Sequence, residues 1–294
     1  MRYWLVMPAA GVGRRFGHVK PKQYAPLQGR TVIEWALTPF LTDPQCAGAA
    51  ISLASDDPYW PEVANQLTKM PGRTADIIVA GGGAERSQSV RKGLEALAGR
   101  ATSDDWILVH DAARPCLSSH DLQQLLGQLG SHPVGGILAT PAADTLKRAS
   151  AETRAAVAAS ATAQTQTPAA AAAGSAPKPI HTLAAANSDS ATAPTTTTTA
   201  SAAPPPPGPE IDQTVDRAGL WRALTPQMFR YQALSDALDR ALAAGRLPTD
   251  EAQALEWTGA HPVLVQGSAA NIKITSADDL VLAAALLNAR EPSA

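Results

Sequence analysis

The chain has 294 residues, of which 45% are hydrophobic and 17% are charged, and its formal net charge is -2. This is the composition of a globular protein, and without a block of Lys or Arg it gives no signal for a nucleic-acid partner. No run approaches the roughly 20 apolar residues that cross a membrane. The two cysteines, Cys46 and Cys116, form no C-x-x-C motif, so neither a zinc site nor a disulfide framework is predicted. We therefore expect a cytoplasmic protein with no membrane partner.

Short apolar runs alternate with helical patterns through the first half of the chain. Strands are expected at residues 3–7, 50–54, 76–79, 106–109 and 136–140. Helices are expected between them at residues 32–41, 61–68, 87–97 and 118–129. This alternation predicts an α/β fold with a doubly wound, mostly parallel sheet. Such folds bind ligands at the carboxyl ends of their strands, so function is sought in the residues that follow each strand.

The alternation stops at about residues 150–209. This segment contains a poly-Ala run, the Thr run 195–199 and the Pro run 204–207, with no aromatic residue. It cannot bury enough surface to offset its ordering entropy, so we expect a disordered low-complexity insertion within a single domain of residues 1–294.

Beyond the insertion, order resumes near residue 211. Helices are expected at residues 231–244, 250–258 and 276–288, and a strand at 262–266. No helix or strand is predicted for residues 220–229.

The loop at residues 8–15 follows the first expected strand directly, and its small residues would let backbone N–H groups approach a phosphate. Phe16 occupies the third glycine position of a dinucleotide fingerprint, and no Gly-Lys-Ser/Thr of a P-loop occurs. Cations are dense in and just behind the loop: Arg14, Arg15, Lys20 and Lys22. That density suits a triphosphate whose charge grows in the transition state. The alternative is a glycine turn followed by a solvated basic loop.

Two further strand ends carry candidate residues. The glycine turn 81–83 leads into a helix that contains Ser89, and it could pass under a flat base or be a plain connection. Asp111 follows the fourth strand, where an acid suits Mg²⁺ or sugar hydroxyls. We interpret His110 as a packing and hydrogen-bonding residue, because phosphate-monoester nucleophiles are already ionised and need no base.

Nine motifs, in order, give the chain a close resemblance to the 2-C-methyl-D-erythritol 4-phosphate cytidylyltransferases of the non-mevalonate isoprenoid pathway. They lie at residues 8–15, 21–24, 82–86 with Ser89, 110–115, 144–147, 214–217, 224–227, 249–252 and 271–275. Each motif is weak alone, but nine of them in the family's order are specific.

The resemblance implies a nucleotide-diphospho-sugar transferase-like fold with a protruding β-arm. The edges of this arm would be residues 144–148 and 211–217, and it would reach into the partner's site in a homodimer. Catalytic roles are implied for Arg15, Lys22, Arg217 and Lys273. CTP would be held by Pro8, Ala9, Ala10, Gly11, Gly82, Gly83 and Ser89. The acceptor would be bound by Asp111, Arg114, Thr145 and Thr249.

The implied reaction transfers CMP from CTP to 2-C-methyl-D-erythritol 4-phosphate, giving 4-diphosphocytidyl-2-C-methyl-D-erythritol and pyrophosphate. Catalysis then consists of aligning two polyanions and neutralising their repulsion, which suits four cations and Mg²⁺. Mg²⁺ would lie near Asp111 and be held mostly by phosphates. Ala84 stands where relatives often carry an acid or another polar residue, and Ala270 stands where some relatives have Asp.

Three alternatives remain. A ribitol 5-phosphate cytidylyltransferase shares most of these motifs, although Ala112 and Ala113 favour the methylerythritol enzymes. A non-catalytic nucleotide-binding module would be expected to have lost some of the four cations. Because no Asp-x-His motif follows Lys273, we expect a stand-alone form rather than a fusion with a zinc-dependent cyclodiphosphate synthase.

Overall fold

The computed structural model describes residues 1–11, 20–150 and 209–290. The chain forms two compact units, residues 1–142 with 219–294 and residues 143–218. The disordered insertion expected at about 150–209 falls almost wholly outside the described residues, as does Arg15.

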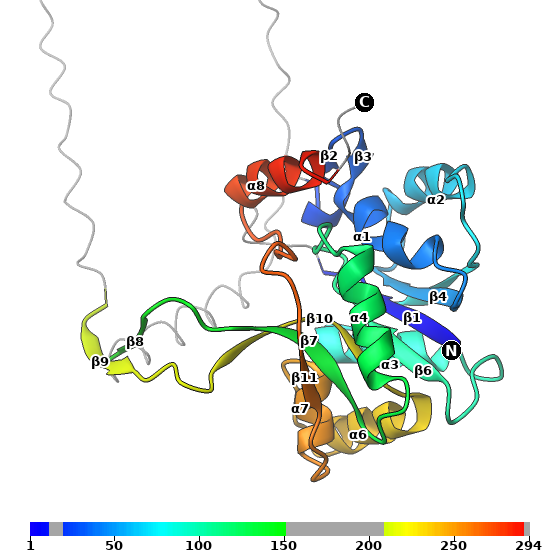
Figure 1. Ribbon diagram of the computed structural model, residues 1–294. Helices are drawn as coiled ribbons and strands as arrows, with labels where there is room; N and C mark the ends of the chain where they lie inside the picture. The colour runs from blue at the N-terminus through cyan, green and yellow to red at the C-terminus, as the bar shows by residue number, and fades with distance from the viewer. Residues whose placement is uncertain (12–19, 151–208, 291–294) are drawn as a thin grey trace, which may run out of the picture. The chain divides into compact units, whose positions relative to one another are not determined.

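The first unit is built on a seven-stranded sheet with the order β11-β7-β10-β6-β1-β4-β5 (Figure 1). Its strands are β1 (Tyr3–Pro8), β4 (Cys46–Leu53), β5 (Ile77–Gly81), β6 (Trp106–Val109), β7 (Gly135–Pro141), β10 (Trp221–Arg230) and β11 (Val263–Gln266). Strand β1 pairs in parallel with β4 and β6, β4 pairs in parallel with β5, and β7 with β11. The mostly parallel sheet that the sequence predicts is therefore confirmed.

Strand β10 is the exception, because it runs antiparallel between β6 and β7. The sequence analysis assigned no strand there. Pro226 lies within it, and a proline cannot donate to a sheet ladder, so it argues against a central strand. The structure accommodates Pro226 where the register with β7 shifts, between Ala223 and Gln227.

Helices cover both faces of the sheet. They are α1 (Val32–Leu41), α2 (Trp60–Thr68), α3 (Arg86–Glu95), α4 (Ser119–Leu129), α6 (Tyr231–Ala243), α7 (Glu251–Glu256) and α8 (Ala277–Asn288). Because side chains alternate along a strand, Leu5 and Met7 pack with α1, α2 and α4, whereas Trp4 and Val6 pack with α3, α6 and α7. This two-sided core is that of the predicted doubly wound fold.

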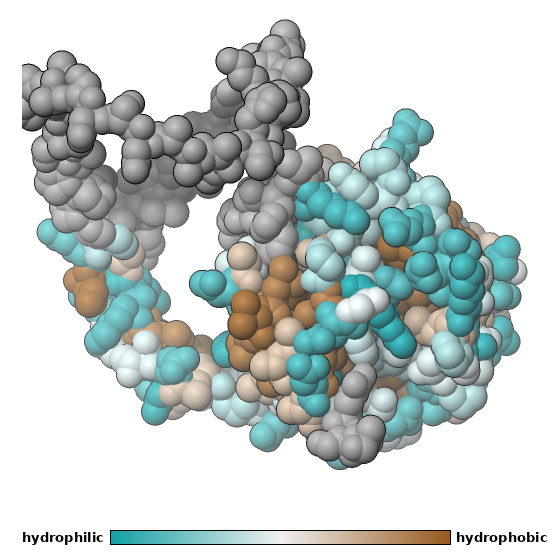
Figure 2. Space-filling view, turned by 90° about the horizontal axis from the view of Figure 1, so that it is seen from above, coloured by the Kyte–Doolittle hydropathy of each residue, from teal (hydrophilic) through white to brown (hydrophobic). Residues whose placement is uncertain are grey.

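A third apolar cluster lies outside these two layers. It packs α8 against the hairpin of β2 (Pro26–Leu27) and β3 (Arg30–Thr31), which follows the short 3₁₀ turn Lys22–Tyr24. The outer side of α8 remains exposed at Val281 and Leu282. Figure 2 views the molecule from the side on which α8 lies and shows a patch of hydrophobic residues there. None of the helices in the described part of the chain has the length and apolar character that crossing a membrane requires.

The second unit contains an antiparallel pair, β8 (Leu146–Ala149) and β9 (Ile211–Val215). The pair reaches as far as Ser150, whose N–H donates to the carbonyl of Glu210 at 3.0 Å. The two expected edges of the arm, 144–148 and 211–217, thus overlap the paired strands β8 and β9, while residues 144–145 and 216–217 lie outside the strands.

Candidate functional site

A pocket of about 400 Å³ lies in the first unit, at the carboxyl ends of β1, β5 and β6. It is lined by Pro8, Ala9, Ala10, Gly11, Lys22, Gln23, Gly83, Ala84, Glu85, Arg86, Ser89, Asp111, Ala112, Ala113 and Lys273. Parallel α/β sheets bind ligands at this end of their strands, so the pocket lies where the fold class predicts a site.

One wall of the pocket is made of backbone and small residues. A Cβ on Gly82 would lie 2.1 Å from the Cβ of Ala10, and a Cβ on Gly83 would lie 2.4 Å from the Cβ of Gln88. The turn after β5 therefore packs directly against the loop after β1 and against α3. The hydroxyl of Ser89 accepts the N–H of Gly83 at 3.0 Å and so fixes the turn.

Gln23 holds the loop after β1 in place by hydrogen bonds. Its side-chain amide is buried and donates to the carbonyls of Ala9 and Gly11 at 2.8 and 3.1 Å. The neighbouring Lys22 donates from Nζ to the carbonyl of Ile274 at 2.8 Å, which ties the start of the chain to the segment that follows β11. The short turn that contains Lys22 and Gln23 therefore does two things. It holds the loop after β1 through Gln23, and it places the Lys22 ammonium at the pocket.

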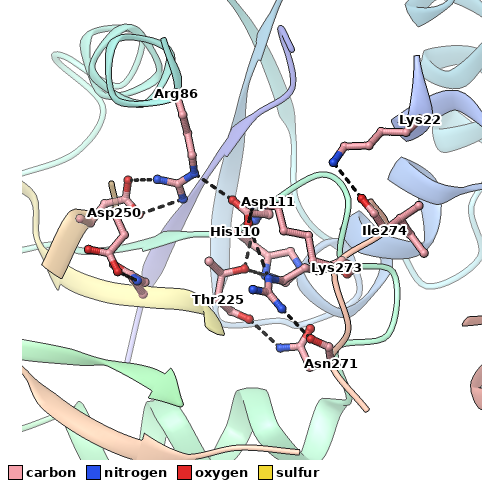
Figure 3. Close-up of polar contacts among 12 residues, drawn as sticks. Lys22, Arg86, His110, Asp111, Thr225, Asp250, Asn271, Lys273 and Ile274 are labelled. Carbon is pink, nitrogen blue, oxygen red and sulfur yellow. Dashed lines mark hydrogen bonds and ion pairs between the residues drawn. The ribbon is translucent and has the colours of Figure 1, made fainter. Parts of the chain in front are cut away.

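The opposite wall is made of charged side chains around Asp111 (Figure 3). Arg86 Nε donates to Asp111 Oδ1 at 2.9 Å, while Lys273 Nζ lies 2.9 Å and Arg114 Nε 3.6 Å from Oδ2. Burial by itself raises the pKa of Asp111, but the attraction of Arg86, Lys273 and Arg114 outweighs it and holds that pKa far below its usual value. Asp111 is therefore ionised at all pH values of interest.

Arg86 also contacts a second acid. Its Nη1 and Nη2 donate to Glu251 Oε1 and Oε2 at 2.6 and 3.0 Å, a forked pair that joins α3 to α7. Burial raises the pKa of Glu251, and Arg86 opposes that rise. The guanidinium thus lies between two carboxylates from distant parts of the sequence.

His110 directly precedes Asp111 in the chain and is fully buried. Burial lowers its pKa to about 4, so the ring is uncharged near neutrality. Its Nε2 lies 3.1 Å from the Arg114 carbonyl, which can only accept, and its Nδ1 lies 3.0 Å from Oγ1 of Thr225. Nε2 therefore carries the proton and the Thr225 hydroxyl donates to Nδ1. This confirms the interpretation of His110 as a packing and hydrogen-bonding residue.

A chain of hydrogen bonds carries this support to Lys273. The Asn271 side-chain amide donates to the Thr225 carbonyl at 2.7 Å, and Arg114 Nη1 donates to the Asn271 carbonyl at 2.7 Å (Figure 3). Asn271 is fully buried two positions before Lys273. The backbone that presents the Lys273 ammonium is therefore anchored to β10 and to the loop after β6.

Most of the expected site residues of the first unit meet at this pocket. It is lined by Pro8, Ala9, Ala10, Gly11, Lys22, Gly83, Ser89, Asp111 and Lys273, and Gly82 and Arg114 lie directly behind that lining. Thr249 does not line it; its side chain is exposed and its N–H bonds to the side chain of Gln253. Thr145 and Arg217 belong to the second unit, where Arg217 donates to the Ala143 carbonyl.

The pocket offers little to hold a metal by protein ligands alone. In residues 1–11, 20–150 and 209–290, no three His, Cys, Asp or Glu side chains are grouped as metal ligands. Both oxygens of Asp111 already face cations. A hard oxygen donor of this kind fits Mg²⁺ only if most ligands come from water and substrate phosphates, which is a common mode for this ion.

Sequence reasoning missed the residues that support the site. Arg86 and Glu251 both lie in motifs, but 165 positions separate them and nothing in the sequence pairs them. Gln23, Thr225 and Asn271 were likewise quoted within motifs without a role. A buried polar residue inside a motif next to a cation is the signal that could have found them.

Comparison with known proteins matches this chain to one family. The family model for 2-C-methyl-D-erythritol 4-phosphate cytidylyltransferase matches residues 3–203 and 176–289. The enzyme of that name from Ectopseudomonas mendocina is 44% identical over 95% of this chain and 93% of its own length, and that from Halorhodospira halophila is 42% identical over 98% and 95%.

Solved structures give the same result. The 2-C-methyl-D-erythritol 4-phosphate cytidylyltransferase of Francisella tularensis is 26% identical, with a TM-score of 0.63 over 97% of this chain and 100% of its own. A 4-diphosphocytidyl-2C-methyl-D-erythritol synthase is 29% identical, with a TM-score of 0.66 over 98% and 99%. With a family match across most of its length and relatives above 40% identity, the chain belongs to the 2-C-methyl-D-erythritol 4-phosphate cytidylyltransferase family.

Proposed function

We propose that this protein transfers CMP from CTP to 2-C-methyl-D-erythritol 4-phosphate, with pyrophosphate as the second product. The observation that carries the proposal is the pocket itself, in which a backbone wall at Ala10 and Gly83 faces a cationic wall around Asp111. A flat base and a triphosphate suit the first wall, and a sugar-alcohol phosphate suits the second. The membership of the chain in a nucleotidyltransferase family supports this assignment.

The reaction requires no general base. The second pKa of a phosphate monoester is near 6, so the acceptor is largely a dianion at neutral pH. One of its phosphate oxygens attacks the α-phosphorus of CTP, the new P–O bond forms in line with the bond to the β-phosphate, and pyrophosphate leaves with that electron pair. The uncharged, fully hydrogen-bonded His110 agrees with a mechanism that moves no proton.

Neutralising repulsion between two polyanions is the main physical task. Lys22 and Lys273 both line the pocket, and we propose that Lys22 stabilises charge on the α-phosphate while Lys273 holds the acceptor phosphate. Arg15 is proposed for the same α-phosphate, although it lies outside the described residues. Donors aimed at developing charge in a closed site are usually the largest catalytic contribution.

We propose that the backbone wall, with Pro8, Gly82 and Ser89 as supports, binds CTP, and that Asp111 and Arg114 bind the acceptor. Mg²⁺, when bound, would neutralise charge on the leaving pyrophosphate and would be held mainly by phosphates, with Asp111 the nearest protein carboxylate. Thr145, Thr249 and Arg217 remain acceptor-site proposals that rest on the family resemblance.

A homodimer in the cytoplasm is also proposed. The exposed apolar side of α8 at Val281 and Leu282 supports self-association, because patches of this kind mark interaction surfaces. We propose that Arg217 serves the partner's site. Mixing inactive Arg217→Ala with inactive Lys22→Ala protein should then restore some turnover, since a hybrid dimer contains one intact site. Subunit exchange without any return of activity would contradict the shared site.

The experiment that tests the proposed function is pyrophosphate release from CTP and Mg²⁺ with each acceptor in turn. We expect turnover with 2-C-methyl-D-erythritol 4-phosphate that exceeds turnover with ribitol 5-phosphate. A preference for ribitol 5-phosphate would assign the rival acceptor. CTP binding with no pyrophosphate released from CTP in the presence of either acceptor would indicate a non-catalytic nucleotide-binding module.

A further inference from the structure

Arg86 joins the two most buried acids beside the pocket. Its side chain is 26% exposed, whereas those of Asp111 and Glu251 are 9% and 1% exposed. The three residues come from α3, from the loop after β6 and from the start of α7. A single guanidinium therefore connects the helix behind the backbone wall with the centre of the charged wall.

These contacts fix the orientations of the three side chains in a definite order. Both terminal nitrogens of Arg86 are engaged by Glu251 in a forked pair, and a forked pair fixes the plane of the guanidinium. Once that plane is fixed, the remaining Nε–H can point only one way, and it meets Asp111 Oδ1 at 2.9 Å. Glu251 thus orients Arg86, and Arg86 in turn orients Asp111.

The charges around Asp111 explain why this matters for the acceptor. Asp111 Oδ2 faces Lys273 at 2.9 Å, so the carboxylate and the acceptor phosphate would compete for one ammonium group. Arg86 supplies Oδ1 with a cation of its own. Without that cation, Asp111 would draw Lys273 more strongly to itself and away from the pocket.

We infer that Arg86 and Glu251 are positioning residues for the acceptor side of the reaction: together they hold Asp111 so that Lys273 remains available to the acceptor phosphate. Neither residue needs to touch a substrate for this role. The inference rests on the function proposed above. The competing interpretation is that the pair merely ties α3 to α7 and contributes to stability alone.

Two variants separate these interpretations. Arg86→Lys keeps the charge but loses the fork, because an ammonium cannot serve both carboxylates with fixed geometry. Glu251→Gln keeps the shape of the side chain, but its NH₂ group now faces a guanidinium nitrogen that also donates. Arg86→Lys removes the guanidinium, and Glu251→Gln leaves the plane of the guanidinium no longer fixed. Each change should therefore hold Asp111 less firmly.

The structure offers a matched control on the same helix. Arg91 forms a forked pair with Asp239, which joins α3 to α6 at the protein surface and does not line the pocket. Arg91→Lys and Asp239→Asn therefore repeat the two chemical changes away from the site.

The measurement is the initial rate of pyrophosphate release, with either substrate varied while the other is saturating, together with Tm. For Arg86→Lys and Glu251→Gln we expect kcat/KM for the acceptor to fall by about tenfold or more, the usual loss for a hydrogen bond to a charged group. KM for CTP should change by less than about twofold, and the two control variants should match the wild type. The double variant should lose little more than Arg86→Lys, since both residues act through one contact.

Equal losses for both substrates, or losses that track Tm in the site and control variants alike, would overturn the inference in favour of a purely structural pair. Should Arg86→Lys fail to fold, Glu251→Gln decides the question alone, and wild-type acceptor kinetics in a folded Glu251→Gln protein would overturn it. A failure of the proposed function gives a different result, because the wild-type protein itself would then release no pyrophosphate. That result would overturn the inference as well.

Discussion

The two walls of the pocket are built by opposite means. The wall at residues 8–11 and 82–83 depends on side chains that are absent, since added carbon atoms at Gly82 would collide with its neighbours. The wall around Asp111 depends on side chains that are present and paired, with three cations facing one carboxylate. The first wall should fail when an atom is added, and the second when a charge is removed. The kinetic parameters of variants can test that contrast.

The largest effect is expected for removing a cation that faces developing charge. Lys22→Ala should lower kcat by about 10²- to 10³-fold with a much smaller change in acceptor KM, as for the loss of one transition-state donor elsewhere. Steady-state kinetics with both substrates measure this. Lys69→Ala, at an exposed position after α2, is the control and should leave kcat unchanged. A Lys22→Ala enzyme with near-normal kcat would remove Lys22 from the catalytic role.

Adding one methyl group should damage the backbone wall. In Gly82→Ala the new Cβ would lie 2.1 Å from the Cβ of Ala10 and 2.9 Å from the Leu53 carbonyl oxygen, so the loop after β1 must move. We expect KM for CTP to rise by about tenfold or more, in line with the 1–3 kcal/mol of overpacking, while acceptor KM changes less.

Gly127→Ala in α4 is the matched control for that change, because nothing lies within 4 Å of the new methyl group. At an exposed helix position Ala should raise stability by about 0.5–1 kcal/mol and leave both KM values unchanged. An unaltered KM for CTP in Gly82→Ala would break the proposed contrast between the walls.

A smaller effect is expected where α8 begins, just behind Lys273. The Asp279 carboxylate accepts the N–H and hydroxyl groups of Thr275 and Ser276. Burial opposes its ionisation, but together these hydrogen bonds outweigh burial and lower its pKa to about 2. The folded pKa lies below the unfolded value near 3.9, so the stabilisation is present above that value and is lost as pH falls towards 2.

Asp279→Asn should therefore lower the free energy of unfolding at pH 7 by no more than about 1 kcal/mol, the usual contribution of a helix cap. Urea unfolding of both proteins from pH 7 down to pH 2.5 tests this, because the difference should shrink below pH 4. A difference that is constant with pH would show that the ionised carboxylate is not what stabilises the start of α8.

No loss of stability or turnover is expected for deleting residues 151–208. Ser150 and Glu210 are hydrogen-bonded to each other, so a linker of about ten residues can rejoin the chain. Loop-closure entropy should then favour the shortened chain by roughly 1.6 kcal/mol. We expect kcat/KM to stay within about twofold of that of the full chain, the number of subunits in the oligomer to be unchanged, and Tm to stay the same or rise slightly. A loss beyond about tenfold would assign the segment a structural role that its composition does not indicate.

Most of the fold could be predicted because it rests on local periodicity. The apolar runs that became β1 and β6 and the helical pattern of α3 lie where the sequence places them. Strand β10 could not be predicted, since Pro226 argues locally against a strand that only its neighbours β6 and β7 stabilise. Tertiary pairing decided that element.

The site divides in the same way. Its lining was predictable, because Gly83, Asp111 and Lys273 each lie in a motif at or near the end of a strand. The pairing among the charges was not, because the partners of Arg86 depend on how α7 packs beside α3 and the sheet. Residue types indicate which chemistry is available, whereas only the three-dimensional arrangement shows which cationic side chain pairs with which carboxylate.

The bond from the Lys22 ammonium to the carbonyl of Ile274 spans 252 positions of sequence. Contacts this distant are formed late, because the loop that joins them must close before they contribute any stability. During synthesis the first half of the chain can build β1, β4 and β5, but the charged wall of the pocket is incomplete until Lys273 and Ile274 have left the ribosome. A nascent or truncated chain that ends before that point can therefore form most of the sheet, but it lacks the carbonyl that holds the Lys22 ammonium, and we expect it to have no working site.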